Sequence, residues 1–375
     1  MSLRRLSGDP ARAQHWCAQL GQSLGASSAG HPRLLLLLAG TDTAAVPGIS
    51  AAGSTPAARQ RTAAADAELL LLGPQQPRPH ALPPLPAGVS PALISHVVAQ
   101  HLRLDPLVVD LGVPVAPAVP HLRCGATPAR CLSGGAAMEP QRVQRLLALG
   151  RRWGERLATQ GAPLVLAECV PGGTTTAQAV LQGLGVEAAG LVSGSLRQPA
   201  HALKAQLVSQ GLAAAGLGPD AAPAAVLAAV GDPMQALAAG LLVGAAQGEQ
   251  PLLLAGGSQM AAVLAVALAL MPPQGRPRLL AQVAIGTTAW VAAEASSDLA
   301  LLLERMAQRW GHPPLAFAAG LRFASCAAAE LLAYEQGYVK EGVGAGGLAL
   351  LWELSGRTPD QLAQACDRAC ASLRS

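Results

Sequence analysis

Two glutamates, each beside a cluster of glycines, are the residues of this sequence best suited to acid–base chemistry. Glu168 follows the apolar run 164–167 and precedes a glycine turn at 171–173. Because open α/β sheets bind ligands at the carboxyl ends of their strands, this position makes Glu168 a candidate functional residue. Glu341 lies in the glycine-rich segment 340–347, and taken alone it is more simply interpreted as a solvated loop acid.

The stretch 163–185 predicts the first half of a βαβ unit. A short buried strand ends in the glycine turn, and three threonines at 174–176 open a segment with helical spacing. Glycines let a ligand approach the backbone closely, and the free N–H groups in the first turn of a helix favour an anion. The candidates for holding such an anion are Gly172, Gly173, Thr174 and Thr175. A tight turn with Thr as the N-cap of a structural helix explains the same residues equally well.

Strand and helix patterns alternate along the chain, which predicts an α/β fold. We expect a doubly wound, mainly parallel sheet with helices on both faces and a smaller helical N-terminal region. The other expected strands are 33–39, 67–72, 107–110, 225–230, 251–255, 279–285 and 315–319, with one more ending at 191–193. Residues 1–137 form an N-terminal α/β portion with Gly- and Pro-rich loops, and residues 138–375 form a second α/β portion. We expect the two portions to pack as one large domain.

Two further stretches carry a specific expectation. The long polar, Gly-rich connection 40–56 follows a predicted strand and is a candidate binding loop, although an ordinary surface loop explains it as well. Gly240, Gly244 and Gly248 are spaced four apart on a predicted helix. Such a face of small residues lets another backbone come close, either within the subunit or across a dimer.

Composition excludes several classes of protein. The net charge of +4 comes from scattered basic residues, and aromatics make up only 2% of the 375 residues. Nucleic-acid binding calls for a basic stripe with interleaved aromatics, so no nucleic-acid partner is expected. The apolar window 252–271 is interrupted at 256–259, which favours a strand, a turn and a buried helix over a membrane span.

The cysteines and motifs predict neither a metal nor a cofactor. Seven cysteines occur without a CxxC pair or nearby histidines at zinc spacing, which suits a reducing cytoplasm. A P-loop lysine motif and a Gly-x-Ser-x-Gly elbow are both absent from the sequence. Gly342-Val343-Gly344 could pass for a dinucleotide loop, but no hydrophobic strand precedes it.

Four segments, in order, resemble the nicotinate-nucleotide–dimethylbenzimidazole phosphoribosyltransferase family. Glu168 with its glycine turn resembles that family's Glu-Met-Gly-Ile-Gly-Asn-Thr-Thr, and is closer still to an uncharacterised related branch with Pro-Gly-Gly-Thr-Thr-Thr here. The segment 191–194 with Lys204 resembles Leu-Val-Gly-Arg-Gly…Lys, and 232–257 resembles Gly-Gly-Phe…Leu-Leu-Asp-Gly. The segment 340–345 resembles the Gly-Glu-Gly-Thr-Gly-Ala around the family's catalytic glutamate. The first 150 residues or so resemble only the related branch.

The resemblance implies transfer of the 5-phosphoribosyl group from nicotinate mononucleotide to a benzimidazole nitrogen, a step in making the lower ligand of cobalamin. Glu341 would be the base that removes the acceptor's ring proton, and Glu168 would assist it or orient the ribose hydroxyls. Lys204 would place a positive charge beside the phosphate. Gly342 and Gly344 would belong to the substrate site, and the protein would be a homodimer.

The sequence also departs from the family. Pro171-Gly172-Gly173 replaces Gly-Ile-Gly-Asn, and 290–295 lacks the histidine of the family's Ser-Ala-Glu-Pro-Gly-His. An adenine-like or another azole acceptor therefore stays open. The alternative function is that of a non-catalytic nucleotide-binding or regulatory protein with the same fold.

Overall fold

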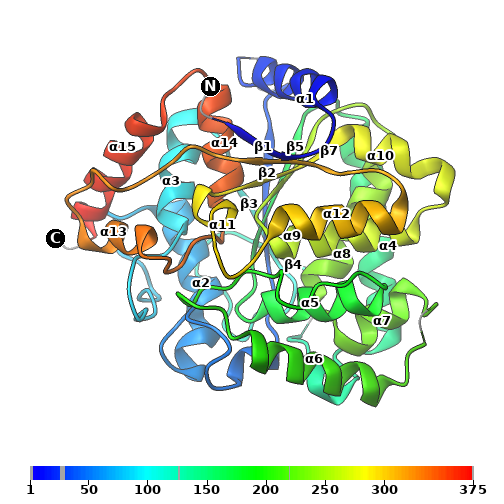
Figure 1. Cartoon of the computed structure of the whole chain (residues 1–375). Coiled ribbons are helices and arrows are strands. Elements are labelled where there is room, and N and C mark those ends of the chain that lie inside the picture. The colour runs from blue at the N-terminus through cyan, green and yellow to red at the C-terminus, as the bar shows by residue number, and fades with distance from the viewer. Residues whose placement is uncertain (1–2, 26–29, 126, 219, 374–375) are drawn as a thin grey trace.

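The computed structural model describes residues 3–25, 30–125, 127–218 and 220–373. One eight-stranded sheet runs through it in the order β1-β8-β7-β6-β5-β2-β3-β4 (Figure 1). In that order the strands are Arg4–Ser7, Leu315–Ala318, Val283–Thr287, Leu252–Ala255, Leu164–Cys169, Arg33–Leu38, Leu107–Asp110 and Leu122–Arg123. Strand β1 is antiparallel to its neighbour, and the other pairs of described strands are parallel. The predicted α/β fold with a mainly parallel sheet is therefore confirmed.

Helices cover both faces of the sheet, because its central strands are apolar on both sides. Alternate residues of β2 enter different cores: Leu35 and Leu37 pack with α4 and α5–α10, whereas Leu34 and Leu36 pack with α1–α3 and α13–α15. The helices that form the first core are α4 (Pro140–Ala158), α5 (Gly173–Gly183), α6 (His201–Ala215), α7 (Pro223–Val230), α8 (Pro233–Ala245), α9 (Ser258–Leu270), α10 (Arg276–Gln282) and α12 (Leu299–Trp310).

The second core is formed by α1 (Pro10–Ser23), α2 (Pro56–Leu72), α3 (Ala92–Leu102), α13 (Ala329–Glu335), α14 (Ala345–Leu354) and α15 (Pro359–Ser372). The short helix α11 is Ala289–Ala292, and the 3₁₀ helices are η1 (Asp42–Ala45), η2 (Leu132–Gly134) and η3 (Pro273–Gly275). The sheet joins strands from both portions of the chain, since β2 lies directly beside β5.

Three strand predictions, at 67–72, 225–230 and 191–193, were wrong, and the prediction at 279–285 was right only for its last three residues. Residues 67–72 are the last turns of the buried helix α2, 225–230 lie in α7, and 279–282 lie in α10 ahead of β7. The segment 191–193 forms turns and irregular backbone. The three segments that proved helical were misassigned because a short apolar run does not distinguish a buried strand from a buried helix, since both present apolar residues on every side. The edge strands β1 and β4 were not predicted.

The glycine face of α8 lies inside the subunit, against α4. A Cβ atom at Gly240 or Gly244 would collide with the backbone carbonyls of Leu147 and Arg151. Gly150 and Gly154 of α4 approach α8 in the same way, so the two backbones are in direct contact. The predicted close approach is therefore made within the chain.

The segment 252–271 consists of β6, a glycine turn and α9, as the sequence predicted. Within the described part of the chain, no helix combines the length and the apolar character that crossing a membrane requires.

Candidate active site

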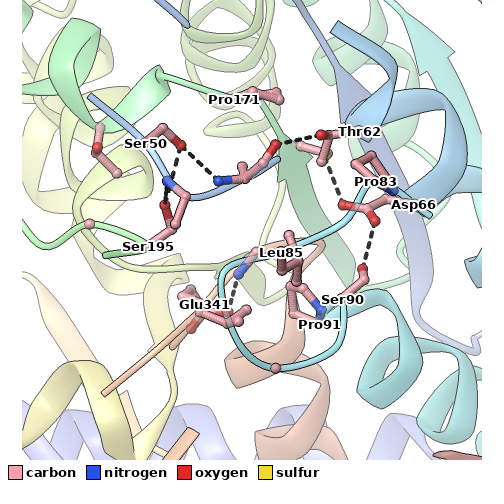
Figure 2. Close-up of a pocket in the computed structure, with 18 of the residues that line it drawn as sticks. Ser50, Thr62, Asp66, Pro83, Leu85, Ser90, Pro91, Pro171, Ser195 and Glu341 are labelled. Carbon is pink, nitrogen blue, oxygen red and sulfur yellow. Dashed lines mark hydrogen bonds between the residues drawn. The ribbon is translucent and has the colours of Figure 1, made fainter. Parts of the chain in front are cut away.

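A cavity of about 360 Å³ lies at the carboxyl ends of β5 and β6. Its lining from the C-terminal two-thirds of the chain includes residues 168–174, 193–195, 257–259 and 341–342. The opposite wall is formed by residues 50–52, Thr62, Asp66 and the segment 82–91 (Figure 2). The parallel strand order contributes to this convergence, because the loops after β2, β5 and β6 leave the sheet at the same edge.

A second, larger cavity of about 1160 Å³ lies near the amino ends of β2 and β3. It contains none of the residues that the sequence singled out for chemistry. The smaller cavity is therefore the candidate active site.

Six of the nine predicted site residues line this cavity: Glu168, Gly172, Gly173, Thr174, Glu341 and Gly342. The other three lie behind its wall. Thr175 is fully buried in α5, and the Lys204 Nζ donates a hydrogen bond of 2.7 Å to the Ser193 carbonyl. Gly344 packs against Ala167, where a Cβ atom would lie 2.7 Å from that residue's own Cβ.

Four hydrogen bonds fix the Glu341 carboxylate. Its Oε2 accepts from the Thr287 hydroxyl at 2.9 Å and the Thr288 N–H at 3.0 Å. Its Oε1 accepts from the N–H groups of Gly342 at 3.2 Å and Gly346 at 3.0 Å. Burial raises the pKa of Glu341, and these donors lower it only in part.

Glu168 is the last but one residue of β5 and is buried at the base of the cavity. Its Oε2 accepts one backbone hydrogen bond, from the Val170 N–H at 3.1 Å. Burial, followed by the charge of Glu341, raises the pKa of Glu168 to about 8. A pKa of about 8 means that Glu168 is mainly protonated at neutral pH.

The glycine turn after β5 is tight and closely packed. Gly172 has a positive φ of 79°, and the Gly173 N–H donates to the Val170 carbonyl at 2.8 Å. A Cβ atom on Gly173 would collide with the Gln259 side chain, which also lines the cavity. Any side chain at position 173 would therefore displace Gln259, so glycine leaves room for the local packing and for the approach of a ligand.

Asp66 is a third cavity carboxyl, and no sequence motif pointed to it. It lies on α2, next to the segment interpreted as a strand, and its side chain is buried. It accepts hydrogen bonds from the Ser90 hydroxyl at 2.6 Å and the Cys169 thiol at 3.4 Å. Burial raises its pKa to about 6. The available signal was an acid inside an otherwise apolar run, since an aspartate is rarely buried without a role.

Part of the polar loop 40–56 reaches the cavity. The Ser195 hydroxyl accepts a hydrogen bond of 2.8 Å from the Ala51 N–H and lies 3.2 Å from the Ser50 hydroxyl. The buried guanidinium of Arg59 holds the loop by donating to the carbonyls of Ala44 and Gly53. The loop is thus a fixed wall of the site, which favours the binding-loop interpretation.

The fold and the site are those of an α/β protein with carboxyl groups and a glycine turn at the carboxyl edge of its sheet. Residues 91–277 match the model of a family described as Phosphoribosyltransferase. A UPF0284 protein of Prochlorococcus marinus (strain MIT 9313) is 54% identical, covering 91% of this chain and 86% of the relative. The UPF0284 protein SYNW1869 of Parasynechococcus marenigrum (strain WH8102) is 55% identical, with 91% and 87% covered. The chain therefore belongs to the UPF0284 branch of the phosphoribosyltransferase family, as the sequence motifs indicated.

Two solved structures from Thermus thermophilus have the same fold. One is that of CobT, with a TM-score of 0.57, 19% identity and 95% of both chains covered. The other is that of a nicotinate-nucleotide–dimethylbenzimidazole phosphoribosyltransferase, with a TM-score of 0.56, 21% identity, and 97% of this chain and 91% of that chain covered. At these sequence identities the two comparisons show a common fold and nothing further.

Proposed function

We propose that this protein transfers the 5-phosphoribosyl group of nicotinate mononucleotide to a ring nitrogen of benzimidazole or a related azole. The products are nicotinate and an α-riboside phosphate, which would serve in making the lower ligand of cobalamin. The observation that carries the proposal is the cavity in which Glu168, Glu341 and the glycine turn meet. The likeness in fold to the solved phosphoribosyltransferase supports the same reaction.

In the proposed reaction, the unprotonated ring nitrogen of the azole attacks C1′ of the ribose. The bond from C1′ to the nicotinate nitrogen breaks, and nicotinate leaves with that electron pair. The attacked azole must then lose the proton on its other nitrogen, so a carboxylate within reach of the ring is needed.

We assign the role of base to Glu341. Four donors favour its ionised form, while Glu168, with a pKa of about 8, keeps its proton at neutral pH. The Glu341 Oε2 becomes free to accept a proton when the Thr287 hydroxyl rotates away. The protonated Glu168 then donates a hydrogen bond to the ribose or assists Glu341. Two carboxyl groups whose environments separate their pKa values commonly divide the work in this way.

Asp66 is the second position for a base. Its pKa of about 6 lies close to a working pH near neutrality, and its two oxygens accept from the Ser90 hydroxyl and the Cys169 thiol. Figure 2 shows it beside Ser90 and Pro91, which belong to the same wall of the cavity. Comparison of Asp66→Asn with Glu341→Gln assigns the base to one of the two.

Gly172, Gly173 and Thr174 are the proposed phosphate-binding residues, with the remaining predicted residues in supporting positions. Thr175 and Gly344 shape the wall, and Lys204 supplies its charge from behind the Ser193 carbonyl, 2.7 Å away. Burial lowers the pKa of Lys204 to about 7, so an anion in the cavity would favour its charged form. We further propose that the protein works as a homodimer in the cytoplasm.

A direct assay tests this function. Purified protein is incubated with nicotinate mononucleotide, either alone or together with one azole: benzimidazole, dimethylbenzimidazole or adenine. The nicotinate released is measured in each reaction. Release that depends on the azole supports the proposal. Saturable binding of the nucleotide without release, for every azole tried, would instead support the non-catalytic nucleotide-binding protein.

A further inference from the structure

We infer that Glu294 and Lys340 form a buried clamp that positions Glu341 against the cavity loop 193–195. As a role in catalysis, this inference rests on the proposed function. The clamp itself is a structural claim and is testable without any activity.

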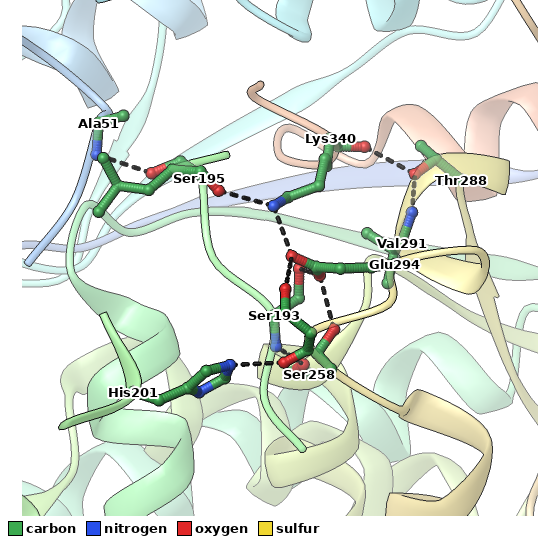
Figure 3. A network of polar contacts seen from close by, with 12 residues as sticks. Ala51, Ser193, Ser195, His201, Ser258, Thr288, Val291, Glu294 and Lys340 are labelled. Carbon is green, nitrogen blue, oxygen red and sulfur yellow. Dashed lines mark hydrogen bonds and ion pairs between the residues drawn. The ribbon is translucent and has the colours of Figure 1, made fainter. Parts of the chain in front are cut away.

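The Glu294 carboxylate joins three segments that are far apart in the sequence. Its Oε1 accepts from the Lys340 Nζ at 2.6 Å, and its Oε2 accepts from the Ser193 hydroxyl at 2.5 Å (Figure 3). The Ser297 hydroxyl donates to the same Oε2 at 2.6 Å. The side chains of Glu294 and Lys340 are only 5% and 2% exposed, so water does not weaken their attraction.

Lys340 extends the connection to the rim of the cavity. Its Nζ also donates to the Leu196 carbonyl at 2.7 Å, next to Ser195. Its own carbonyl accepts from the Thr288 hydroxyl at 2.6 Å. The N–H of Thr288 in turn donates to the Glu341 carboxylate, so the clamp and the proposed base share a partner.

The backbone at this point is held in an unfavourable conformation. Val339, Lys340 and Val343 have φ values of 64°, 65° and 52°, in the left-handed region that non-glycine residues rarely adopt. Such strain persists only where surrounding contacts fix the segment. The two bonds of the Lys340 Nζ and the bond from the Val339 N–H to the Ser195 carbonyl, 3.1 Å, supply that restraint.

The clamp explains two buried polar groups that the proposed reaction does not use. Neither Glu294 nor Lys340 lines the cavity, and the desolvation cost of burying an ion pair is offset only when its geometry and its hydrogen bonds are good. Here it ties the segment carrying Glu341 to the segment carrying Ser193 and Ser195, both of which do line the cavity. Glu294 and Lys340 are therefore positioning residues.

The test compares Glu294→Gln, Lys340→Met and the double variant with wild type. Hydrogen–deuterium exchange by mass spectrometry reports the amides of 338–346 and 191–197, with β5 as an internal reference. We expect at least tenfold faster exchange in both segments for each single variant, and no further increase in the double variant. Unchanged exchange in these segments would overturn the clamp, whether or not the protein is a transferase.

Kinetics separate positioning from general stability. With an azole that supports turnover by wild type, each single variant should lose about 10- to 100-fold in kcat while the KM for the nucleotide changes less than about threefold. The double variant should lose no more than the worse single variant, because residues that act as a unit are not additive. Independent, multiplicative losses in the double variant, or a kcat per folded molecule equal to that of wild type, would contradict positioning.

Glu68→Gln is the matched control. Glu68 is another buried carboxylate, which accepts hydrogen bonds from the N–H groups of His80 and Ala118, but it does not line the cavity. The Glu68→Gln variant should have a lower melting temperature than wild type, but its amides in 338–346 should exchange hydrogen for deuterium no faster. Inactivity of wild type with every azole would refute the proposed function and leave the exchange result to decide the clamp.

Discussion

At the scale of single residues, the proposed chemistry depends on the protonation states of three of the four carboxyl groups that line the cavity. Glu341 is surrounded by donors, Glu168 has one backbone donor and a pKa of about 8, and Asp66 has a pKa of about 6. Sequence motifs pointed to the two glutamates, because each stands beside a recognisable glycine cluster. Asp66 has no such neighbours, and only the packing of α2 against the site brings it into the cavity.

Glu341→Gln should preserve nucleotide binding and lower turnover. Glutamine keeps the size of the side chain but cannot accept a proton, and loss of a positioned base costs about 10²–10⁴ in rate, roughly 3–5 kcal/mol of barrier. Glu168→Gln should cost less, because Gln reproduces the hydrogen-bonding role of a protonated carboxyl. Steady-state kinetics with an active azole measure both. If Asp66→Asn shows the large loss and Glu341→Gln turns over like wild type, the base is Asp66.

The raised pKa of Glu168 predicts a specific dependence of stability on pH. The folded protein holds this proton up to a pH of about 8, whereas an exposed glutamate in the unfolded chain loses it near the ordinary value of 4.5. Between these values the folded state binds more protons, so the contribution of Glu168 to stability falls as pH rises. Thermal melts of wild type and Glu168→Gln from pH 5 to 9 should therefore diverge, with the variant relatively more stable at high pH. Parallel curves would show that Glu168 is ionised in the fold.

Gly173→Ala should weaken nucleotide binding, because the added methyl group displaces Gln259 at the mouth of the proposed phosphate site. The collision is with a side chain, so alanine is a milder probe here than valine. Titration calorimetry with nicotinate mononucleotide measures the affinity. Gly134→Ala serves as the control, since a Cβ there meets nothing within 4 Å. Equal affinity in the two folded variants would show that this turn does not bind the phosphate.

At the scale of elements, long connections and glycine spacing were informative, and short apolar runs were not. The glycine spacing of α8 predicted a close approach, and the partner proved to be α4, which contributes its own glycines 150 and 154. In contrast, the apolar segments at 67–72 and 225–230 gave no periodicity that separates a buried helix from a strand. Both lie in helices that begin with a proline at the first position, Pro56 and Pro223. That proline was the local signal for a helix.

Gly244→Leu should destabilise the subunit, because the side chain would enter the backbone of α4 at the Arg151 carbonyl. Overpacking of this kind costs about 1–3 kcal/mol or more. Urea unfolding measures the loss, with Val243→Leu, at a half-buried neighbouring position, as the control. Because the contact is internal, the folded fraction should keep the mass of wild type in solution. A changed mass at unchanged stability would place this face between subunits.

At the scale of the whole molecule, the sequence predicted the class of fold but not the order of the strands. Alternating patterns require a parallel sheet, yet nothing local says that β5 lies between β2 and β6. That order brings the loop after β2, the turn after β5 and the segment around Glu341 to one edge. From the sequence, only the lining residues within family motifs could therefore be predicted. The lining residues from the N-terminal part of the chain follow from the topology of the sheet.

The identity of the product is the sharpest test of phosphoribosyl transfer. Nuclear magnetic resonance follows a reaction of wild-type protein, nicotinate mononucleotide and an azole that stimulates nicotinate release. We expect one riboside phosphate per nicotinate released, with the azole nitrogen bonded to C1′ in the α configuration. Ribose 5-phosphate in place of a riboside, or a nucleotide recovered intact with every azole, would contradict phosphoribosyl transfer by this protein.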